Sequence, residues 1–378
     1  GAKDTEGVAR NVQRGLVLSL VLSVPGALLL LNGEPILRAF GQPAEVIPQA
    51  GAYTRYAAPG VLPFYVFLVF RQSLQAFTRM APIVWSIVIS NVLNAALNWV
   101  LIFGHLGAPP MGVAGASIAS TIGRWIAPFL LLALSWHQLK PALLPLQRAA
   151  LEPAPLGRMV RLGAPIGLQM LLEYTAFGTV GLLMGRIGTT AVAAHQVALN
   201  LASLTFMVPL GVGQAGAVLV GHAVGSRDAL AARGAARAAV LWGVGFMALA
   251  AVAFLLVPRP LATFYTTDLA TIELAAMLIP VAGVFQLFDG MQAVTAGLLR
   301  GAGDTRVPML TNLAGFWLFG IPLCLALAFG LDMGPMGLWW GLAAALSVVA
   351  TLLARRTWRI LHQPLERVVI EAPAAAQL

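Results

Sequence analysis

The sequence predicts an all-α polytopic membrane protein, and three observations support this fold class. Hydrophobic residues make up 59% of the 378-residue chain and charged residues only 10%, whereas a soluble protein carries about 25% charged residues. The apolar residues form ten runs, each long enough to cross or nearly cross the hydrocarbon core of a bilayer. Basic residues divide unequally between alternate loops, as the positive-inside rule requires of a multi-pass protein.

Ten membrane helices are expected in chain order. Four precede the basic segment 138–160 and six follow it, at residues 15–31, 54–74, 83–104, 112–134, 164–185, 192–220, 238–257, 277–299, 309–330 and 336–354. Several contain proline, for example Pro25, Pro63 and Pro209. Membrane helices tolerate proline because neighbouring helices and waters satisfy the freed backbone groups.

The distribution of Lys and Arg predicts the orientation. Eighteen basic residues fall on one side of the ten spans and four on the other, namely Arg38, Arg55, Arg186 and Arg259. The side rich in basic residues, which includes both ends of the chain, is therefore expected to face the cytoplasm. The expected location is a bacterial inner membrane. The net charge of +9 follows from this topology, so we expect membrane lipid and no nucleic acid as a partner.

A long-period repeat predicts two lobes. The tetrapeptide GAKD at 1–4 recurs as GSRD at 225–228, and PMG at 110–112 recurs at 335–337. An offset of six helices gives both copies the same membrane orientation, as in transporters with parallel repeats. We expect a lobe at 1–150 with four helices and a lobe at 151–378 with six. The unmatched helices of the second lobe predict about two further helices before Gly1.

Two carboxylates lie well inside the expected spans. Glu173 occurs in MLLEYTAF, 170–177, and Asp289 in VFQLFDGMQAV, 284–294. A charged side chain at the bilayer centre costs about 2.5–3.5 kcal/mol on insertion scales, so it usually marks a functional cavity. The carboxylates could bind a proton or a small hard cation such as sodium, or they could be structural partners of Arg124 or of a helix end.

Other polar side chains leave several interpretations open. Arg124 could line a cavity or extend to the membrane surface. Asn200 lies deeper in its span than His195, so Asn200 is the better cavity candidate and His195 suggests an interfacial or capping role. Phe285 and Gln286 are further candidates beside Asp289. The chain has no nucleotide-binding GxxxxGK[ST] motif, no cofactor motif and no evident cluster of metal ligands, and Cys324 is its single cysteine. An enzyme is therefore not expected.

Three motifs carry a resemblance to a known family. They are AAHQVALN at 193–200, VGHAVGSRD at 220–228 and LLRGAGDTRVP at 298–308. With the two buried acids, they make the chain similar to the multidrug and toxic compound extrusion (MATE) family, NorM type. The resemblance implies two six-helix lobes and export of small organic cations, by a monomer, in exchange for protons or sodium.

The resemblance also assigns roles to residues. It implies that Glu173 and Asp289 couple transport to the cation, with sodium as one candidate ion at this pair. Phe285 stands four residues before Asp289, where some sodium-coupled members have tyrosine, so proton coupling stays open beside sodium. The alternative is a lipid-linked oligosaccharide flippase or polysaccharide exporter of the same superfamily. Such proteins usually have a more cationic cavity, whereas this chain buries two acids against one arginine.

Overall fold

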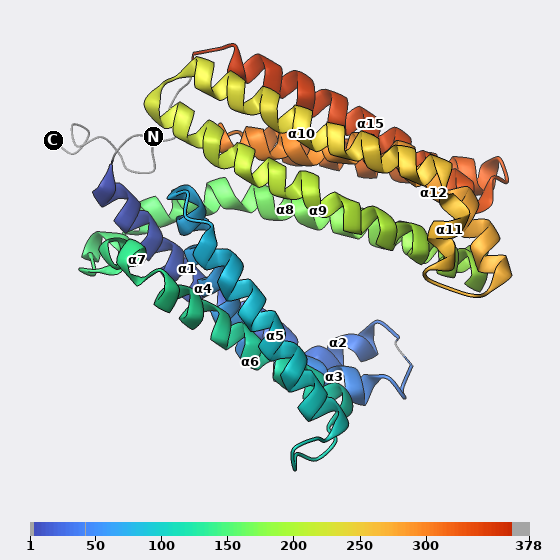
Figure 1. Ribbon diagram of the computed structural model, residues 1–378, viewed down its shortest axis with the longest axis horizontal. Coiled ribbons are helices and arrows are strands. Elements are labelled where there is room, and N and C mark those ends of the chain that lie inside the picture. Colours follow the sequence, from blue (N-terminus) through green and yellow to red (C-terminus); the bar gives the residue numbers. More distant parts are fainter. Residues whose placement is uncertain (1–3, 42, 365–378) are drawn as a thin grey trace. The chain divides into compact units, whose positions relative to one another are not determined.

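The computed structural model describes residues 4–41 and 43–364, and all regular elements in these ranges are helices (Figure 1). The described residues form two compact units, which meet between Leu156 and Gly157. A short 3₁₀ turn ends at Leu151, and the next long helix starts at Pro153 and continues into the second unit. Proline suits this position because the first turn of a helix does not use its N–H groups.

The first unit contains four membrane-length segments and several short elements. Its helices are α1 (Thr5–Leu31), α2 (Gly33–Ala39), α3 (Ile47–Ala57), η1 (Ala58–Gly60), α4 (Val61–Ala76), α5 (Ala81–Phe103), α6 (Gly112–Leu134), α7 (Trp136–Leu143) and η2 (Arg148–Leu151). The segments α3, η1 and α4 form one continuous span, Ile47–Ala76. Within this unit α5 packs along α6, and α1 packs against α4.

The second unit contains six membrane-length segments. Its helices are α8 (Pro153–Ile187), α9 (Thr189–Ser226), α10 (Ala229–Leu256), α11 (Pro258–Thr263), α12 (Leu269–Gly301), α13 (Arg306–Asn312), η3 (Leu313–Gly320), α14 (Ile321–Leu325), η4 (Ala326–Gly330) and α15 (Gly334–Leu361). The run from α13 to η4 forms one span in which η3 and η4 are π-helical. Helix α12 is central, because it contacts α9, α10, α11 and α15.

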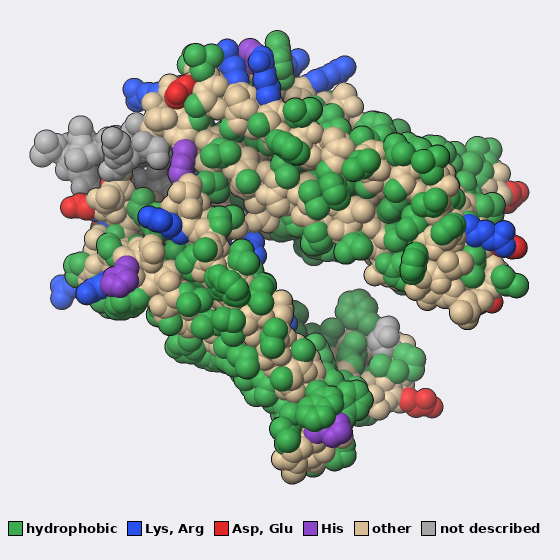
Figure 2. Space-filling model, in the orientation of Figure 1, with side chains coloured by type: hydrophobic (Ala, Val, Ile, Leu, Met, Phe, Trp, Pro, Cys, Tyr) green, Lys and Arg blue, Asp and Glu red, His purple; other side chains and the backbone are tan. Residues whose placement is uncertain are grey.

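The ten expected spans are confirmed. Ten helices of the described residues are long and apolar enough to cross a membrane. Most are longer than the apolar runs, for example Pro153–Ile187 against the expected 164–185. Helices continue beyond the hydrocarbon core because their backbone hydrogen bonds do not depend on apolar side chains. Figure 2 shows hydrophobic side chains along most of each unit and charged ones gathered mainly toward the helix ends.

The repeated tetrapeptide has a structural explanation. Asp4 caps α1 by accepting a hydrogen bond from the backbone N–H of Gly7, at 2.8 Å, and Asp228 caps α10 by accepting one from Ala231, at 2.9 Å. Aspartate is among the preferred N-cap residues because its carboxylate satisfies a free N–H of the first turn. The helix order after each cap also agrees: a long helix, a short helix and three further spans.

Close contact between α9 and α12 depends on glycine. A Cβ atom at Gly213 would lie 2.8 Å from the carbonyl oxygen of Ala293, and one at Gly297 would lie 2.7 Å from the carbonyl carbon of Gly213. Such distances exclude a side chain, so the two backbones meet directly, as in membrane helix pairs with small residues at their interface. This contact fixes the neighbouring faces of α9 and α12.

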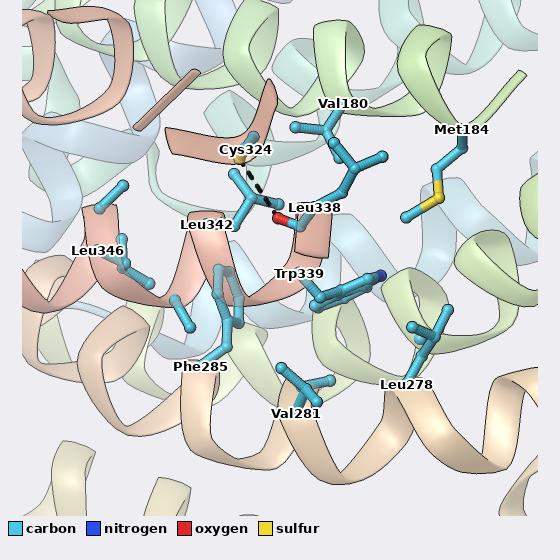
Figure 3. Packing of buried hydrophobic residues seen from close by; sticks show 14 of the residues in the cluster. Val180, Met184, Leu278, Val281, Phe285, Cys324, Leu338, Trp339, Leu342 and Leu346 are labelled. Atoms are coloured by element: carbon cyan, nitrogen blue, oxygen red, sulfur yellow. Dashed lines mark hydrogen bonds between the residues drawn. The ribbon is translucent and has the colours of Figure 1, made fainter. Parts of the chain in front are cut away.

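The core of the second unit lies among α8, α9, α12 and α15. Figure 3 shows Phe285 and Trp339 facing each other there, with ring centroids 5.7 Å apart in an edge-to-face arrangement. The Cys324 thiol donates a hydrogen bond to the carbonyl of Leu338 at 3.3 Å, which ties α14 to α15 (Figure 3). Cys324 is fully buried and free.

Candidate functional site

A pocket of about 270 Å³ lies within the second unit, between α8, α9 and α12. Each helix contributes one face. The lining residues are Gln169, Met170, Glu173, Tyr174 and Phe177 of α8; Leu199, Ala202, Ser203, Phe206, Met207 and Leu210 of α9; and Phe285, Asp289, Gln292, Ala293, Ala296 and Arg300 of α12. The spacings of three and four residues place these side chains on one stripe of each helix.

The structure brings Glu173 and Asp289 to this one pocket, although they lie 116 positions apart in the sequence. Asp289 is 6% exposed. The two carboxylates interact electrostatically, and Arg300 attracts Glu173 from the same lining. Two acids and one base therefore share a small, largely apolar space, where water screens charges poorly.

Two amide side chains hold the Glu173 carboxylate. Nε2 of Gln292 donates to Oε2 of Glu173 at 3.1 Å, and Nδ2 of Asn312 donates to the same oxygen at 3.3 Å. Gln292 belongs to α12 and Asn312 ends α13, so Glu173 connects three helices. Hydrogen bonds to a carboxylate are stronger than those between neutral groups.

The same amides have unused acceptors. Oε1 of Gln292 and Oδ1 of Asn312 are buried and have no hydrogen-bond partner among the described residues. An unsatisfied buried polar atom costs about 1–3 kcal/mol, so it suggests a ligand or a functional rearrangement. These oxygens lie on the side chains that already bind Glu173, which makes the surroundings of this carboxylate rich in oxygen.

Aromatic and methionine side chains form most of the remaining wall. Phe177 and Phe285 meet edge to face, with centroids 5.9 Å apart. Met170, Met207 and Phe206 add polarizable apolar surface. Aromatic faces attract organic cations, and methionine adapts to ligands of different shape.

The other expected site residues lie elsewhere. Asn200 is exposed and donates to the carbonyl of Gln196 at 2.8 Å, and Gln286 is fully buried and accepts a hydrogen bond from Thr205; neither lines this pocket. Arg124 belongs to the first unit, where its side chain covers Gly60. The pocket therefore contains Glu173, Asp289 and Phe285 of the six expected residues.

His195 is packed among the helices of the second unit. His195 is 1% exposed, and its ring lies edge-on to Trp339 with centroids 5.6 Å apart. Neither His195 Nδ1 nor Trp339 Nε1 has a partner among the described residues. The helices α8 and α15 cover His195. This burial could not be predicted from the span of His195 alone, because the covering residues lie on other helices.

Sequence reasoning missed the amide and guanidinium side chains that line the pocket or contact Glu173, namely Gln169, Gln292, Arg300 and Asn312. The helical spacing could have found two of them, because Gln169 is four residues before Glu173 and Gln292 three after Asp289. Arg300 directly follows the expected span 277–299 and is one of the eighteen basic residues expected on the cytoplasmic side. Asn312 approaches Glu173 only through tertiary packing.

No cluster of three or more His, Cys, Asp or Glu side chains that could hold a metal occurs at residues 4–41 and 43–364. The pocket contains the carboxylates of Glu173 and Asp289. The two amide side chains that bind Glu173, those of Gln292 and Asn312, each keep a free oxygen. Such oxygens suit a proton or a small hard cation rather than a transition metal.

Comparison with known proteins gives the relatives of this chain. The MatE family model matches residues 1–100 and 165–326. The multidrug resistance protein NorM of Burkholderia vietnamiensis is 39% identical over 368 residues, which cover 95% of this chain and 78% of that protein. A probable multidrug resistance protein NorM of Rhizobium meliloti is 39% identical over 396 residues, which cover the whole chain and 81% of the relative.

Solved structures show the same fold. The eukaryotic MATE transporter AtDTX14 superposes with a TM-score of 0.84 at 25% identity, over 94% of this chain and 79% of that one. An outward-facing multidrug resistance MATE family transporter of the MOP superfamily gives a TM-score of 0.86 at 19% identity, over 96% and 80% of the two chains. The family match, the NorM relatives and the shared fold agree, and this multi-pass membrane protein therefore belongs to the MATE family.

Proposed function

We propose that this protein is a multidrug efflux transporter that exports small organic cations in exchange for protons or sodium. The NorM relatives, which are named multidrug resistance proteins, support the multidrug part. The observation that carries the cation part is the pocket in which Glu173 and Asp289 lie beside aromatic and methionine side chains.

The two carboxylates give the pocket its coupling chemistry. A buried ionised carboxylate is unfavourable, so an entering proton or sodium ion stabilises the conformation in which the pocket is closed to water. An organic cation competes for the same negative charge. The pocket then releases the ion on one side of the membrane and the drug on the other. Because the two cannot occupy the pocket together, ion entry is linked to drug export.

The wall of the pocket suits the drug. Phe177, Phe206 and Phe285 offer aromatic faces, and Met170 and Met207 offer flexible apolar surface. This combination binds planar and bulky cations without a fixed shape. Specificity then comes from charge, and a broad set of organic cations becomes transportable.

For a sodium ion, the oxygens of Glu173 and Asp289 are the proposed ligands. The free amide oxygens of Gln292 and Asn312 add acceptors once the side chains turn. For a proton, the same turned amides accept from the protonated carboxyl group. The absence of a tyrosine hydroxyl at Phe285 removes one sodium ligand and leaves proton coupling open.

The remaining assignments follow the transport proposal. The chain acts as a monomer in the bacterial inner membrane, with the described end at Asp4 and the end at Pro364 on the cytoplasmic side. Export of a lipid-linked oligosaccharide is disfavoured, because the acids in the pocket outnumber Arg300 and would repel a pyrophosphate.

The decisive experiment uses proteoliposomes that contain the complete protein and a fluorescent organic cation. Proton and sodium gradients are imposed separately, and dye movement is measured against protein-free vesicles. Dye transport driven by either gradient supports the proposal and identifies the ion. Equal dye movement with and without both gradients would contradict coupled antiport.

A further inference from the structure

The sequence and the structure place Arg300 in different environments. In the sequence it opens the cytoplasmic turn GAGD, which made it one of the basic residues that set the topology. In the structure it stands in the last turn of α12 and lines the pocket. Its Nε donates to the carbonyl of Ala296 at 3.2 Å, and Ala296 also lines the pocket. The side chain therefore turns back along the helix toward the carboxylates.

The charged groups of the pocket can be counted helix by helix. Helix α8 contributes Glu173 and the phenol of Tyr174, and α12 contributes Asp289 and Arg300. The α9 residues that line the pocket carry no titratable side chain, and Asn312 of α13 contributes a neutral amide. With both carboxylates ionised, the pocket has one net negative charge.

We propose that Arg300 is a specificity-determining residue that limits the pocket to one positive charge per ligand. This inference rests on the proposed function. A monovalent organic cation neutralises the fully ionised pocket, whereas a divalent one leaves an excess positive charge in a poorly screened space. Arg300 also repels the second charge directly. The transporter should thus discriminate against dications of similar ring structure.

Two simpler roles for Arg300 make different predictions. A cation at the C-terminal end of a helix stabilises it through the free carbonyl groups, and a cytoplasmic arginine supports membrane orientation. Loss of either role would reduce folding or correct insertion. Neither role changes the preference between monovalent and divalent ligands in the protein that does fold.

The test measures binding of ethidium, a monocation, and propidium, a dication with the same ring system, to the purified protein in nanodiscs. The quantity of interest is the ratio of the two dissociation constants, because size effects cancel between variants. Arg300→Gln should strengthen propidium binding relative to ethidium binding by about tenfold or more, as expected for one unit charge in a poorly screened pocket. Arg300→Lys should retain the native ratio.

Two further variants make the result specific. Arg306→Gln removes an exposed basic residue at the start of α13, six positions after Arg300, and should leave the ratio unchanged. Glu173→Gln combined with Arg300→Gln restores one net negative charge and should return the ratio toward the native value. Glu173→Gln alone leaves the pocket neutral, so the ratio should shift toward propidium from this single variant to the double variant. If Arg300→Gln alone folds poorly, that comparison tests the inference, and an unchanged ratio between the two would overturn it.

The outcomes separate the inference from the proposed function. A native ratio in folded Arg300→Gln would overturn the inference while leaving the proposed function intact. An equal shift in Arg306→Gln would also overturn it, because a general surface-charge effect would then explain the change. Failure of the native protein to bind either dye would instead refute the proposed function.

Discussion

Gln292 of α12 donates a hydrogen bond to Glu173 of α8 across 3.1 Å, and Asn312 of α13 donates to the same carboxylate oxygen. This junction joins three helices at a charged group inside the membrane-spanning part of the second unit. A change in the charge of Glu173 therefore changes contacts on three helices together. This geometry supports the proposed coupling role of Glu173, because ion binding could then favour one arrangement of the helices.

The first prediction concerns coupling. Glu173→Gln keeps the side-chain volume but removes the ionisable group, so the protein should insert normally and lose gradient-driven efflux. Asp289→Asn should behave alike. If the two acids act as a unit, the double variant should be little worse than either single one. Efflux is measured in proteoliposomes with equal amounts of folded protein. Native efflux by Glu173→Gln under both gradients would contradict the proposed role.

The second prediction concerns the amide donor. Gln292→Leu removes a hydrogen bond to a charged group, which is worth about 1.5–3 kcal/mol. Thermal unfolding of the Glu173→Gln, Gln292→Leu and double variants forms a mutant cycle, and we expect a coupling energy of about 0.5–3 kcal/mol. Asn200→Leu is the matched control, because Asn200 is exposed and bonds only within α9. If the losses of stability in the two single variants simply add up in the double variant, the contact between Glu173 and Gln292 contributes nothing to stability.

The third prediction concerns the α9–α12 contact. Gly297→Ala places a methyl group against the backbone of Gly213, so it should destabilise the protein by about 1–3 kcal/mol through overpacking. Gly245→Ala in α10 is the control, since a Cβ there meets nothing within 4 Å. Thermal unfolding in detergent measures both. Equal melting temperatures for the two variants would be inconsistent with direct backbone contact.

The fourth prediction concerns topology. In a Cys324→Ser background, Leu230→Cys should react with a membrane-impermeant thiol reagent from the cytoplasmic side and Leu331→Cys only from the outside. Both leucines are well exposed, at 79% and 68%. Leu331 is preferable to Asp332, whose positive φ of 52° disfavours cysteine. Cytoplasmic labelling of Leu331→Cys would reverse the assigned orientation.

The sequence alone determined the fold class, because membrane insertion depends on local properties. Long apolar runs must form helices to satisfy their backbone, and each run can be read without knowing its neighbours. The ten spans are of this kind. The cost of burying a charge also singles out Glu173 and Asp289 within their spans, and this cost depends only on their depth in the membrane.

Tertiary structure decided which polar side chains share a pocket. Gln292 and Asn312 are uncharged, so their burial costs too little to make them stand out among the other amides of the spans. Arg300 counts as a loop residue until the direction of its side chain is known. Asn200 and Gln286 seemed equally suited to the pocket, but the rotation of α9 and α12 about their axes directs them elsewhere. That rotation is set by direct contact between Gly213 and Gly297, which lie 84 positions apart, and no local pattern contains such a contact.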